Sequence, residues 1–469
     1  MAVLISMSSE FRRLPSVDKL IFEERIKRLE ETYPHELVVG LVRQQLERIR
    51  LSITAGNLCP SIDDIIEAIC AQLSALEKSS LRPVINATGV ILHTNLGRAP
   101  LSREAITAMD TLARGYSNLE FDLDSGARGS RDTHTEQILC QLTGAEAALV
   151  VNNNASALLL ALTALTRRKE VIVSRGEAVE IGGSFRIPDV MRQSGAKLVE
   201  IGTTNCTYIN DYEQAINSRT AALMRVHSSN FRITGFTHSV DIEELVTISR
   251  QYDLPLIDDL GSGCFLEITT FGLAPEPTVQ QSVSAGAGLV LFSGDKLVGG
   301  PQAGIIVGKK PLVGKLKRHP LARALRIDKV LLAGLVTTLL HYLKGEAVEK
   351  IPVWHMISAS LEEIDRRAKA LAEVLDGSAQ VVEGESMIGG GSLPGSTLPT
   401  RLVAIGAGRK RNARNVAQTL ARRLRNQDTP VIGRISDDVL LLDPRSVLPE
   451  EDEIVLQALR GLVADLKSA

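Results

Sequence analysis

The sequence has few cysteines, and those it has are not arranged for cross-linking or for binding zinc. Its 469 residues include five cysteines, and no two of them form a CxxC pair. An odd number of scattered cysteines argues against a disulfide framework and against a structural zinc site. Because disulfides are rare in reducing compartments, a cytoplasmic location is the simplest interpretation.

Long apolar runs, a secretory leader and an excess of basic charge are also missing. No apolar stretch reaches the length that crosses a bilayer, and the first residues lack a basic start followed by an apolar core. The formal net charge is -2, so any binding of nucleic acid must come from local basic patches. One such run lies between Gly308 and Asp328, with no acidic residue inside it.

What the sequence does contain is the patterning of a globular protein with several domains. Its hydrophobic content of 44% and charged content of 23% are ordinary for folded chains. Residues 1–80 carry apolar side chains at three- and four-residue steps, which predicts a helical N-terminal domain. Residues 81–330 alternate short runs rich in valine and isoleucine with helical segments, and residues 331–469 predict a smaller α+β domain. The predicted fold class is α/β, with a mostly parallel sheet in the large domain.

Ligands of parallel sheets bind at the carboxyl ends of the strands, so the loops after the apolar runs are where chemistry is expected. In VVNNNASALLLAL, we expect a strand to end at Val151 and a helix to begin near Ser156. The free N–H groups of a helix N-terminus suit a phosphate, and the hydroxyl of Ser156 can add a donor. Taken alone, the segment is more simply explained as an N-cap without a ligand.

Two further loops carry ionisable residues. LPLIDDLGSG ends an apolar run with Asp258 and Asp259, and such carboxylates can hold a protonated ring nitrogen of a cofactor or a divalent metal. FSGDKLVGGPQAG places Lys296 among Ser293, Asp295 and several glycines. A partly desolvated lysine can form a Schiff base, and a nearby serine can bind a phosphate oxygen. Taken alone, Lys296 is more simply explained as a surface charge.

Arginines supply a third kind of signal. NLGRAP places Arg98 in a glycine turn, and HPLARALRID places Arg323 and Arg326 three residues apart, on one face if the segment is helical. Arginine pairs grip phosphate through the fork geometry of their guanidinium groups. A solvated surface is the alternative interpretation for each of them.

The order of these features is more specific than any one of them. A phosphate-binding turn opens a helix, an aspartate ends a strand, and 38 residues after Asp258 a lysine follows another strand. This is the order found in pyridoxal-phosphate enzymes with an aspartate-aminotransferase-like large domain. In these enzymes the lysine binds the cofactor, and the aspartate keeps the ring nitrogen protonated, which makes the ring an electron sink.

The chain also resembles one particular family. The segments that carry the resemblance extend over nearly the whole sequence and are RRLPSVDKLI, VINATGVILHTNLGRAPLS, EFDLDSGARGSR, SRGEAVEIGGSFRIPDVM, GTTN, IDDLGSG, FSGDKLVGGPQAGIIVG and GGGSLPG. Together they are similar to bacterial selenocysteine synthase, the L-seryl-tRNA(Sec) selenium transferase. The resemblance implies a PLP-dependent transferase fold, with pyridoxal 5'-phosphate as cofactor.

The resemblance further implies a reaction and an assembly. Seryl-tRNA(Sec) joins the cofactor as an aldimine, loses its α-proton and then its hydroxyl as water, and the resulting aminoacrylyl-tRNA takes selenium from selenophosphate to give selenocysteinyl-tRNA(Sec). Members of the family assemble as homodecamers, pentamers of dimers, with active sites between subunits. Their N-terminal domain grips the tRNA, which assigns that role to residues 1–80 here.

Carried over by position, the resemblance assigns Lys296 as the Schiff-base lysine and as the base for the α-proton. Asp258 matches the partner of the ring nitrogen, with Asp259 as the alternative. Many relatives of this fold stack an aromatic ring or a histidine on the cofactor in the loop after the EVIVS strand. This chain departs from that pattern, because the loop reads SRGEAVE, with Glu177 and Ala178.

Anion-binding positions are carried over in the same way. The phosphate side of the cofactor corresponds to Asn154, Ala155, Ser156 and Ser293. The arginines that would hold selenophosphate are Arg98, Arg323 and Arg326. Asp295 is assigned to the tRNA end of the site as a further catalytic residue, and no metal is expected.

Two other functions are compatible with parts of the sequence. A related pyridoxal-phosphate lyase or aldolase that acts on a free amino acid would share the core, but it has no obvious need for the helical first 80 residues. A non-catalytic RNA-binding protein is expected to be more basic and to have more than 3% aromatic residues for stacking bases. The tRNA-dependent selenium transferase is therefore the primary prediction.

Overall fold

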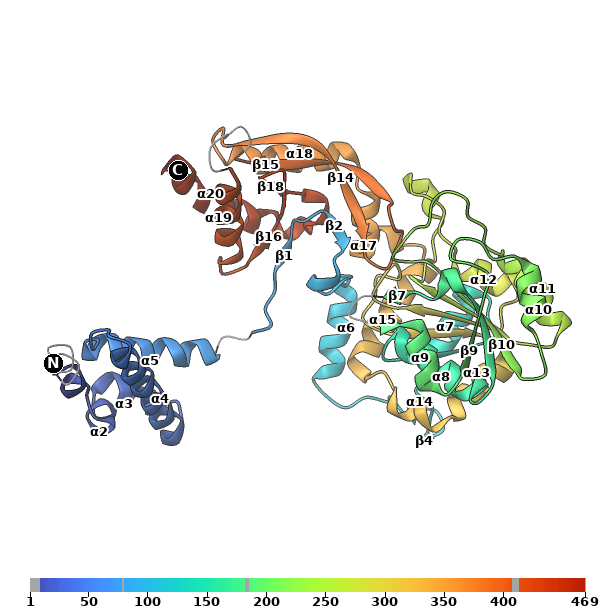
Figure 1. Ribbon diagram of the computed structural model, residues 1–469, viewed down its shortest axis with the longest axis horizontal. Coiled ribbons are helices and arrows are strands. Elements are labelled where there is room, and N and C mark those ends of the chain that lie inside the picture. Colours follow the sequence, from blue (N-terminus) through green and yellow to red (C-terminus); the bar gives the residue numbers. More distant parts are fainter. Residues whose placement is uncertain (1–8, 78–79, 182–184, 407–412, 469) are drawn as a thin grey trace. The chain divides into compact units, whose positions relative to one another are not determined.

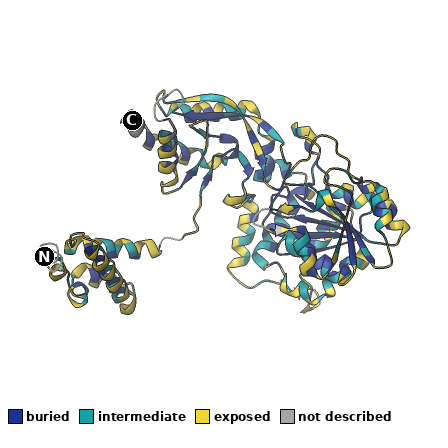
Figure 2. Cartoon of the chain, viewed as in Figure 1, coloured by how far each residue is buried: buried dark blue, intermediate teal, exposed yellow. Residues whose placement is uncertain are grey.

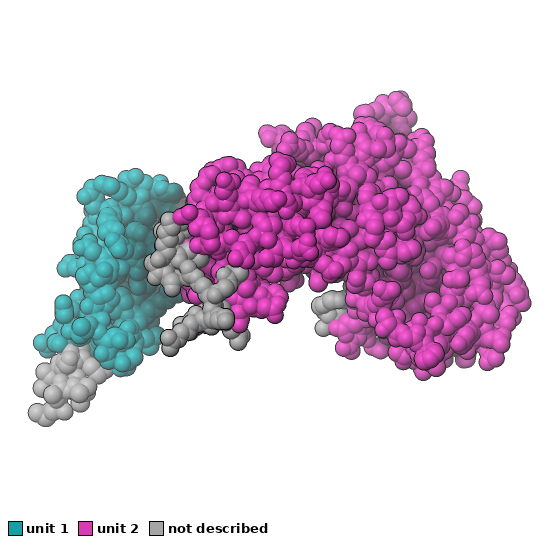
Figure 3. Space-filling view, turned by 90° about the horizontal axis from the view of Figure 1, so that it is seen from above, with its two compact units in different colours: residues 1–83 teal, residues 84–469 magenta. Residues whose placement is uncertain are grey.

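The structure is a computed structural model that describes residues 9–77, 80–181, 185–406 and 413–468. Contacts divide the chain into two compact units, residues 1–83 and 84–469, which Figure 3 colours separately. The predicted division of the larger unit at residue 330 stays a prediction. In the described part of the chain, no helix is both long enough and apolar enough to cross a membrane.

The smaller unit is helical. Ser16 caps its helix α2, because the hydroxyl oxygen accepts the backbone N–H of Lys19 at 3.2 Å. Apolar side chains at three- and four-residue steps form a core within this unit, which includes Leu20, Val42 and Ile69. The helices are α2 (Val17–Ile21), α3 (Glu24–Glu30), α4 (His35–Thr54) and α5 (Ile62–Glu77).

A seven-stranded sheet forms the core of one lobe of the larger unit (Figure 1). Its strand order is β5-β13-β12-β11-β10-β6-β9, and only the two pairs made by β13 are antiparallel. The prediction of an α/β fold with a mostly parallel sheet is confirmed. The strands are β5 (Ala147–Val151), β6 (Glu170–Ser174), β9 (Lys197–Ile201), β10 (Thr220–Val226), β11 (Leu256–Gly261), β12 (Leu289–Ser293) and β13 (Gly304–Gly308).

Helices cover both faces of this sheet, and the central strands β11 and β12 are buried along their whole length (Figure 2). One face packs against α7 (Thr133–Thr143), α11 (Ile242–Gln251), α12 (Val279–Ala285) and α15 (Lys329–Leu343). The other face packs against α8 (Asn154–Thr166), α9 (Ile187–Ser194) and α13 (Lys310–Arg318). Along β11, Leu256 and Leu260 belong to the first face and Ile257 to the second. Because side chains alternate along a strand, Asp258 and Asp259 point to opposite faces.

A second sheet, of five strands, lies in the C-terminal part of the larger unit. Its order is β17-β18-β15-β14-β2, and β2 (Val90–Leu92) precedes the large sheet in sequence and pairs in parallel with β14 (Ala379–Gly389). Three helices share a separate apolar core with this sheet. These elements are β15 (Thr397–Ile405), β17 (Arg434–Ser436), β18 (Val439–Leu442), α18 (Leu361–Glu373), α19 (Ala413–Arg425) and α20 (Asp452–Ser468).

Shorter elements connect the two sheets or lie at their edges. Three pairs of two-residue strands lie outside the two sheets: β1 (Ile85–Asn86) with β16 (Val431–Ile432), β3 (Phe121–Asp122) with β4 (Ala127–Arg128), and β7 (Glu180–Ile181) with β8 (Phe185–Arg186). Further helices are α6 (Arg103–Ala113), α10 (Ile209–Ala215), α14 (Pro320–Ala324), α16 (Ala347–Lys350) and α17 (Pro352–Ser358).

Candidate active site

Lys296 lies in the turn between β12 and β13, at the carboxyl end of the large sheet. Only 4% of its surface is exposed. Burial lowers the pKa of its amine, and the charge of Arg98 lowers it further. The carboxylates of Asp259, Asp295 and Glu276 raise the pKa and offset part of this decrease. A buried lysine with a lowered pKa is suited to act as a nucleophile or a base. The interpretation of Lys296 as a surface charge is therefore wrong.

The turn that carries Lys296 is held from outside by hydrogen bonds. The backbone N–H of Leu297 donates to the carbonyl of Ser262 at 3.1 Å. The hydroxyl oxygen of Tyr342, on α15, lies 3.0 Å from the carbonyl oxygen of Leu297 and 2.9 Å from that of Val298. These contacts fix the backbone that follows the lysine, so the amine is positioned by rigid elements on both sides.

Two glycines let the chain pass close to the amine. Gly391, between β14 and β15, has a φ of +81°, and a Cβ there would lie 2.7 Å from Nζ of Lys296. Gly261, at the end of β11, has a φ of +65°, and a Cβ there would lie 3.7 Å from the same atom. Both backbones therefore form a cradle beside the amine that side chains would fill. The GGGSLPG segment carries no predicted role, although its consecutive glycines signal a close approach.

Asp259 is the aspartate that lies beside the lysine. Its carboxylate accepts hydrogen bonds from Nδ2 of Asn154 at 2.8 Å and from the N–H of Gly261 at 3.1 Å. Burial raises its pKa to about 6, while Asn154 and the charge of Lys296 act in the opposite direction. Asp259 therefore ties the end of β11 to the start of α8, its charge acts on Lys296, and it is largely ionised at neutral pH.

Asp258 points to the opposite face of β11, where its Oδ1 lies 3.7 Å from Nη1 of Arg225. Burial raises the pKa of Asp258, whereas the charge of Arg225 and the hydroxyl of Ser282 lower it. Neither carboxylate oxygen has a hydrogen-bond partner of regular geometry among the described residues. The charge of Asp259, and not that of Asp258, acts on the pKa of Lys296, whereas the buried oxygens of Asp258 lack a partner among the described residues. Which of the two would hold a ring nitrogen stays a prediction.

The turn before α8 combines an N-cap with buried polar atoms. The helix starts at Asn154, and the side-chain oxygen of Asn153 accepts the N–H of Ser156 at 2.9 Å. The amide oxygens of Asn152 and Asn154 are buried, with no hydrogen-bond partner in the described ranges. Ser293 ends β12 and is 6% exposed. Unpaired buried polar atoms at a helix N-terminus fit a polar ligand.

Two of the predicted phosphate-side residues have other surroundings. Ala155 and Ser156 line a hollow of about 270 Å³ together with residues of α9, among them Asp189 and Gln193. The first turn of α8 therefore presents Asn154 toward Asp259, and the following two side chains toward α9.

Arg98 and Asp295 form an ion pair next to the lysine. Nη1 of Arg98 lies 2.7 Å from Oδ2 of Asp295, and their side chains are 28% and 11% exposed. Arg98 has a φ of +65°, a conformation that few residues other than glycine adopt. The family resemblance assigns these two residues to different ligands, whereas the structure pairs them and places their charges close enough to act on Lys296.

Arg323 and Arg326 line another cavity, of about 520 Å³, which Arg98 does not line. Nη1 of Arg326 lies 3.4 Å from Oε1 of Glu120. The spacing predicts a shared face only if the segment is helical. Helix α14 ends at Ala324, before Arg326, so the two arginines do not share a helical face. Within one chain, the three predicted anion-binding arginines are therefore not brought together.

A cavity of about 380 Å³ opens at the carboxyl ends of β6 and β10. Its lining includes His227, which directly follows β10, Glu276, and Leu393 of the GGGSLPG segment. Lys296 does not itself line the cavity, but two observations place the cavity near it. Leu393 lies two residues after Gly391, which lies against the amine, and the charge of Glu276 acts on the pKa of the lysine.

His227 and Glu276 form a pair in this cavity that the sequence pattern does not predict. Nε2 of His227 lies 3.1 Å from Oε2 of Glu276, and the hydroxyl of Ser262 donates to Oε1 at 2.6 Å. The backbone N–H of His227 donates to the carbonyl of Asp259 at 2.9 Å. The two partners lie 49 residues apart in loops, and their only signal is a histidine placed directly after a strand.

The loop after β6 contributes Glu177 to the lining of the same cavity. Its carboxylate accepts the N–H of Val226 at 2.9 Å. Burial raises the pKa of this carboxyl to about 7, although that hydrogen bond and the charge of Arg225 both act to lower it. The loop therefore contributes an ionisable group, rather than a ring, to the wall of the cavity.

Comparison of the sequence with known protein families assigns the chain to one of them. Residues 84–448 match the family described as L-seryl-tRNA selenium transferase, and residues 11–50 match the family described as selenocysteine synthase N terminal. The chain belongs to the L-seryl-tRNA selenium transferase family. The predicted resemblance is thereby confirmed.

Curated relatives match this selenium transferase family member over nearly its full length. A protein from Geobacter sulfurreducens named L-seryl-tRNA(Sec) selenium transferase is 48% identical, over 97% of this chain and 99% of that protein. Proteins of the same name from Caldanaerobacter subterraneus and Moorella thermoacetica are 47% and 49% identical. They cover 97% and 96% of this chain, and 99% and 97% of their own lengths.

A solved structure shares the fold of this family member. The structure of D-glucosaminate-6-phosphate ammonia-lyase superposes with a TM-score of 0.59 at 23% identity, over 85% of this chain and 99% of that one. At that identity the likeness concerns the fold alone. The predicted α/β fold class with a helical N-terminal region is confirmed.

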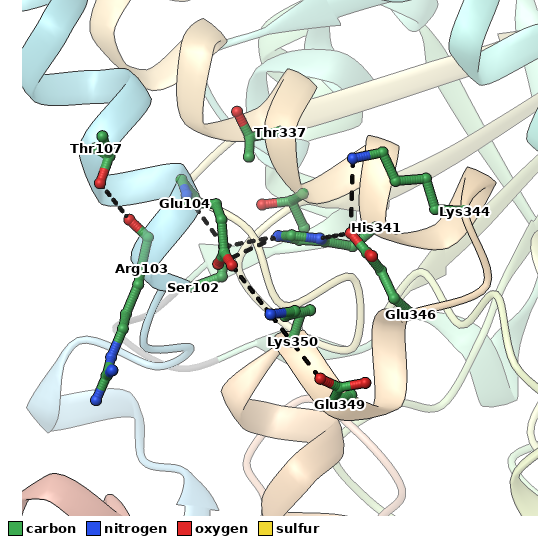
Figure 4. A network of polar contacts seen from close by, with 12 residues as sticks. Ser102, Arg103, Glu104, Thr107, Thr337, His341, Lys344, Glu346, Glu349 and Lys350 are labelled. Carbon is green, nitrogen blue, oxygen red and sulfur yellow. Dashed lines mark hydrogen bonds and ion pairs between the residues drawn. The ribbon is translucent and has the colours of Figure 1, made fainter.

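A second polar network of this selenium transferase family member lies where α6 meets α15 (Figure 4). Nε2 of His341 lies 3.0 Å from Oγ of Ser102, and Nδ1 lies 2.7 Å from Oε1 of Glu346. The order resembles a hydrolytic triad, but Ser102 is 2% exposed and its oxygen caps α6 by accepting the N–H of Ala105. The network is therefore structural, and it anchors the helix that bears Tyr342.

Proposed function

We propose that this chain converts seryl-tRNA(Sec) to selenocysteinyl-tRNA(Sec), with selenophosphate as the selenium donor and pyridoxal 5'-phosphate as cofactor. The observation that carries the proposal is the buried amine of Lys296 beside Asp259, in a chain whose relatives are named L-seryl-tRNA(Sec) selenium transferase. The proposal is tested by identifying the amino acid on the tRNA after incubation with both substrates.

The residues around Lys296 fit pyridoxal phosphate. The amine would bind the cofactor, Asp259 would hold the ring nitrogen, and Asn154 with Ser293 would lie on the phosphate side. Gly391 and Gly261 keep side chains away from the amine, as a ligand bound to the amine would require. When bound, the cofactor withdraws electrons from the serine Cα and makes its proton acidic.

Each of these residues then has a defined task. The amine of Lys296, with its lowered pKa, removes the proton at Cα and returns it at the end. The carboxylate of Asp259 is ionised above about pH 6 and keeps a ring nitrogen protonated. The buried turn around the lysine, held by Tyr342, excludes water from the reacting atoms.

The Asp259→Asn variant tests the choice between the two aspartates. We expect it to lower the rate of product formation by about 10- to 100-fold, because a charged hydrogen bond of about 1.5–3 kcal/mol is lost. Asp258→Asn is the matched variant on the other face of the same strand, and it should change the rate much less than it changes the melting temperature. Single-turnover rates of both variants, at equal cofactor loading, provide the measurement. A larger rate loss in Asp258→Asn would instead assign that residue as the ring-nitrogen partner.

Selenophosphate binding is proposed for Arg98, Arg323 and Arg326. The cavity lined by Arg323 and Arg326 also contains Arg128, Arg131, Lys317 and Arg318, together with the carboxylates of Glu120 and Asp132. The basic groups outnumber the acidic ones, which supports anion binding there. Arg98 lies elsewhere and is paired with Asp295. An assembly with sites between subunits would allow arginines of two copies to meet, so we propose a homo-oligomer, a decamer built from dimers.

Alanine variants of these arginines should separate the two halves of the reaction. We expect Arg323→Ala and Arg326→Ala to raise the selenophosphate concentration needed for half-maximal rate by about 10-fold or more, because a charged contact is worth about 1.5–3 kcal/mol. Loss of water from the serine should change little. Both steps are followed with labelled seryl-tRNA(Sec), with and without selenophosphate. An equal decrease in both steps would argue against an anion pocket.

The tRNA, the N-terminal unit and the cell compartment complete the proposal. The matched N-terminal family supports a dedicated role for residues 1–80, and we assign them to tRNA binding in the cytoplasm. The alternative function, a lyase or aldolase acting on a free amino acid, has less support, because the relatives named for a tRNA substrate also span this unit.

A further inference from the structure

We propose that His227 is the acid that protonates the departing serine hydroxyl, and that Glu276 is the positioning residue that holds it for this task. The inference rests on the proposed function, because it concerns the loss of water from the seryl group. It is carried by the geometry of the 380 Å³ cavity near Lys296, which both residues line.

The position of His227 is fixed at both its backbone and its ring. Its N–H bonds to the carbonyl of Asp259 at 2.9 Å, which ties the start of the loop after β10 to the strand that carries that aspartate. Nε2 lies 3.1 Å from Glu276. Among the described residues, Nδ1 has no hydrogen-bond partner, and 20% of the side chain is exposed in a residue that lines the cavity. One ring nitrogen is therefore anchored, and the other is available to a substrate.

Glu276 is placed to orient the imidazole of His227. Its side chain is 3% exposed, and its second oxygen accepts the hydroxyl of Ser262 at 2.6 Å. Ser262 also provides the carbonyl that binds the N–H of Leu297, next to the lysine. A buried carboxylate with its other oxygen occupied stabilises an imidazolium on the remaining one, as in acid–base pairs of hydrolases.

The reaction needs such an acid because hydroxide is a poor leaving group. The other ionisable groups near Lys296 are engaged: Asp259 with Asn154, and Arg98 with Asp295. The lysine itself handles the α-proton. A histidine is the side chain that gives up a proton most readily near neutral pH, and a positioned acid of this kind contributes about 10²- to 10⁴-fold.

The step balances without an added reagent. The amine of Lys296 takes the α-proton, and the electron pair of that C–H bond forms the Cα–Cβ double bond. The Cβ–O bond breaks, and the departing oxygen takes the Nδ1 proton of the imidazolium and leaves as water. Lys296 ends as an ammonium and His227 as a neutral imidazole, which recovers its proton from solvent through the open cavity.

A change of leaving group tests this role directly. The full-length, cofactor-loaded His227→Gln variant is given tRNA(Sec) charged either with serine or with β-chloroalanine, and elimination is measured as pyruvate released on alkaline deacylation. Chloride needs no proton to depart. We expect elimination from the seryl group to fall about 100-fold or more, and elimination from the β-chloroalanyl group to stay within about threefold of wild type. The Glu276→Gln variant should show the same selectivity with a smaller loss.

Controls separate this role from a structural one. The visible spectrum, the cofactor retained on gel filtration and the melting temperature of His227→Gln should match those of wild type. His134→Gln, a partly buried histidine whose Nε2 lies 3.2 Å from the carbonyl oxygen of Leu119, should react with both substrates at wild-type rates. Equal loss with both substrates, a shifted visible spectrum or unchanged seryl elimination would overturn the inference. A wild-type chain that fails to act on seryl-tRNA(Sec) would instead overturn the proposed function.

Discussion

Replacing Lys296 with alanine is expected to abolish the visible absorbance of the cofactor-bound chain and to lower product formation by at least about 10²- to 10⁴-fold. The amine is the only lysine nitrogen in the described cradle of Gly391 and Gly261, so no other amine replaces it there. Absorbance spectra after loading with the cofactor and removal of its excess, together with single-turnover assays, measure both effects.

Lys309→Ala provides the matched control for this prediction. Lys309 follows the next strand, β13, and is exposed, so its loss should leave the spectrum and the rate unchanged. A Lys296→Ala protein that keeps the visible absorbance, or a wild-type protein that stays colourless after loading, would contradict the assignment of Lys296.

Deleting residues 1–83 is expected to weaken binding of tRNA(Sec) by about 100-fold or more, which corresponds to about 2.7 kcal/mol, and to leave cofactor binding intact. The physical reason is that the two units have separate cores: the apolar residues of the first unit pack on one another, and the Lys296 site is built only from the second. Filter binding of labelled tRNA and the visible spectrum of the same preparation measure the two properties.

The spectrum serves as the internal control for the deletion. A truncated chain that binds tRNA as well as the full chain would refute the assignment of the N-terminal unit. A truncated chain that loses the cofactor absorbance would show that the larger unit depends on the smaller one for its folding.

The parts of the site that the sequence could predict depend on local patterns. Short apolar runs between helices predict a mostly parallel sheet, and Lys296 follows one of these runs, so its place at the carboxyl edge is a consequence of topology. The N-cap at Asn153 and the start of α8 likewise follow from local side-chain chemistry.

Features that depend on packing could not be predicted in this way. Adjacent aspartates on one strand differ only in the face to which they point, and that face is decided by the helices that cover the sheet. His227 and Glu276 belong to loops and are 49 residues apart in the sequence. No local pattern in either loop indicates that the two residues make contact. Gly391, which lies against the amine of Lys296, belongs to the connection between β14 and β15 of the second sheet. The way this hairpin packs against the large sheet depends on tertiary structure, which local patterns do not encode.

The arginines show the same limit at the level of assembly. Arg98 forms its ion pair within the turn next to Lys296, whereas Arg323 and Arg326 line a different cavity of the same chain. A spacing of three residues suggests a shared helical face, but α14 ends before Arg326. Whether the three meet across copies depends on surfaces that local patterns do not encode.

The most direct test of the account is to incubate the full-length, cofactor-loaded chain with seryl-tRNA(Sec) and selenophosphate, and to identify the amino acid then attached to the tRNA by mass spectrometry. The proposed function predicts selenocysteine on the tRNA with wild type and unchanged serine with Lys296→Ala. Serine that remains on the tRNA with wild type, while a free amino acid is consumed by the same preparation, would contradict it.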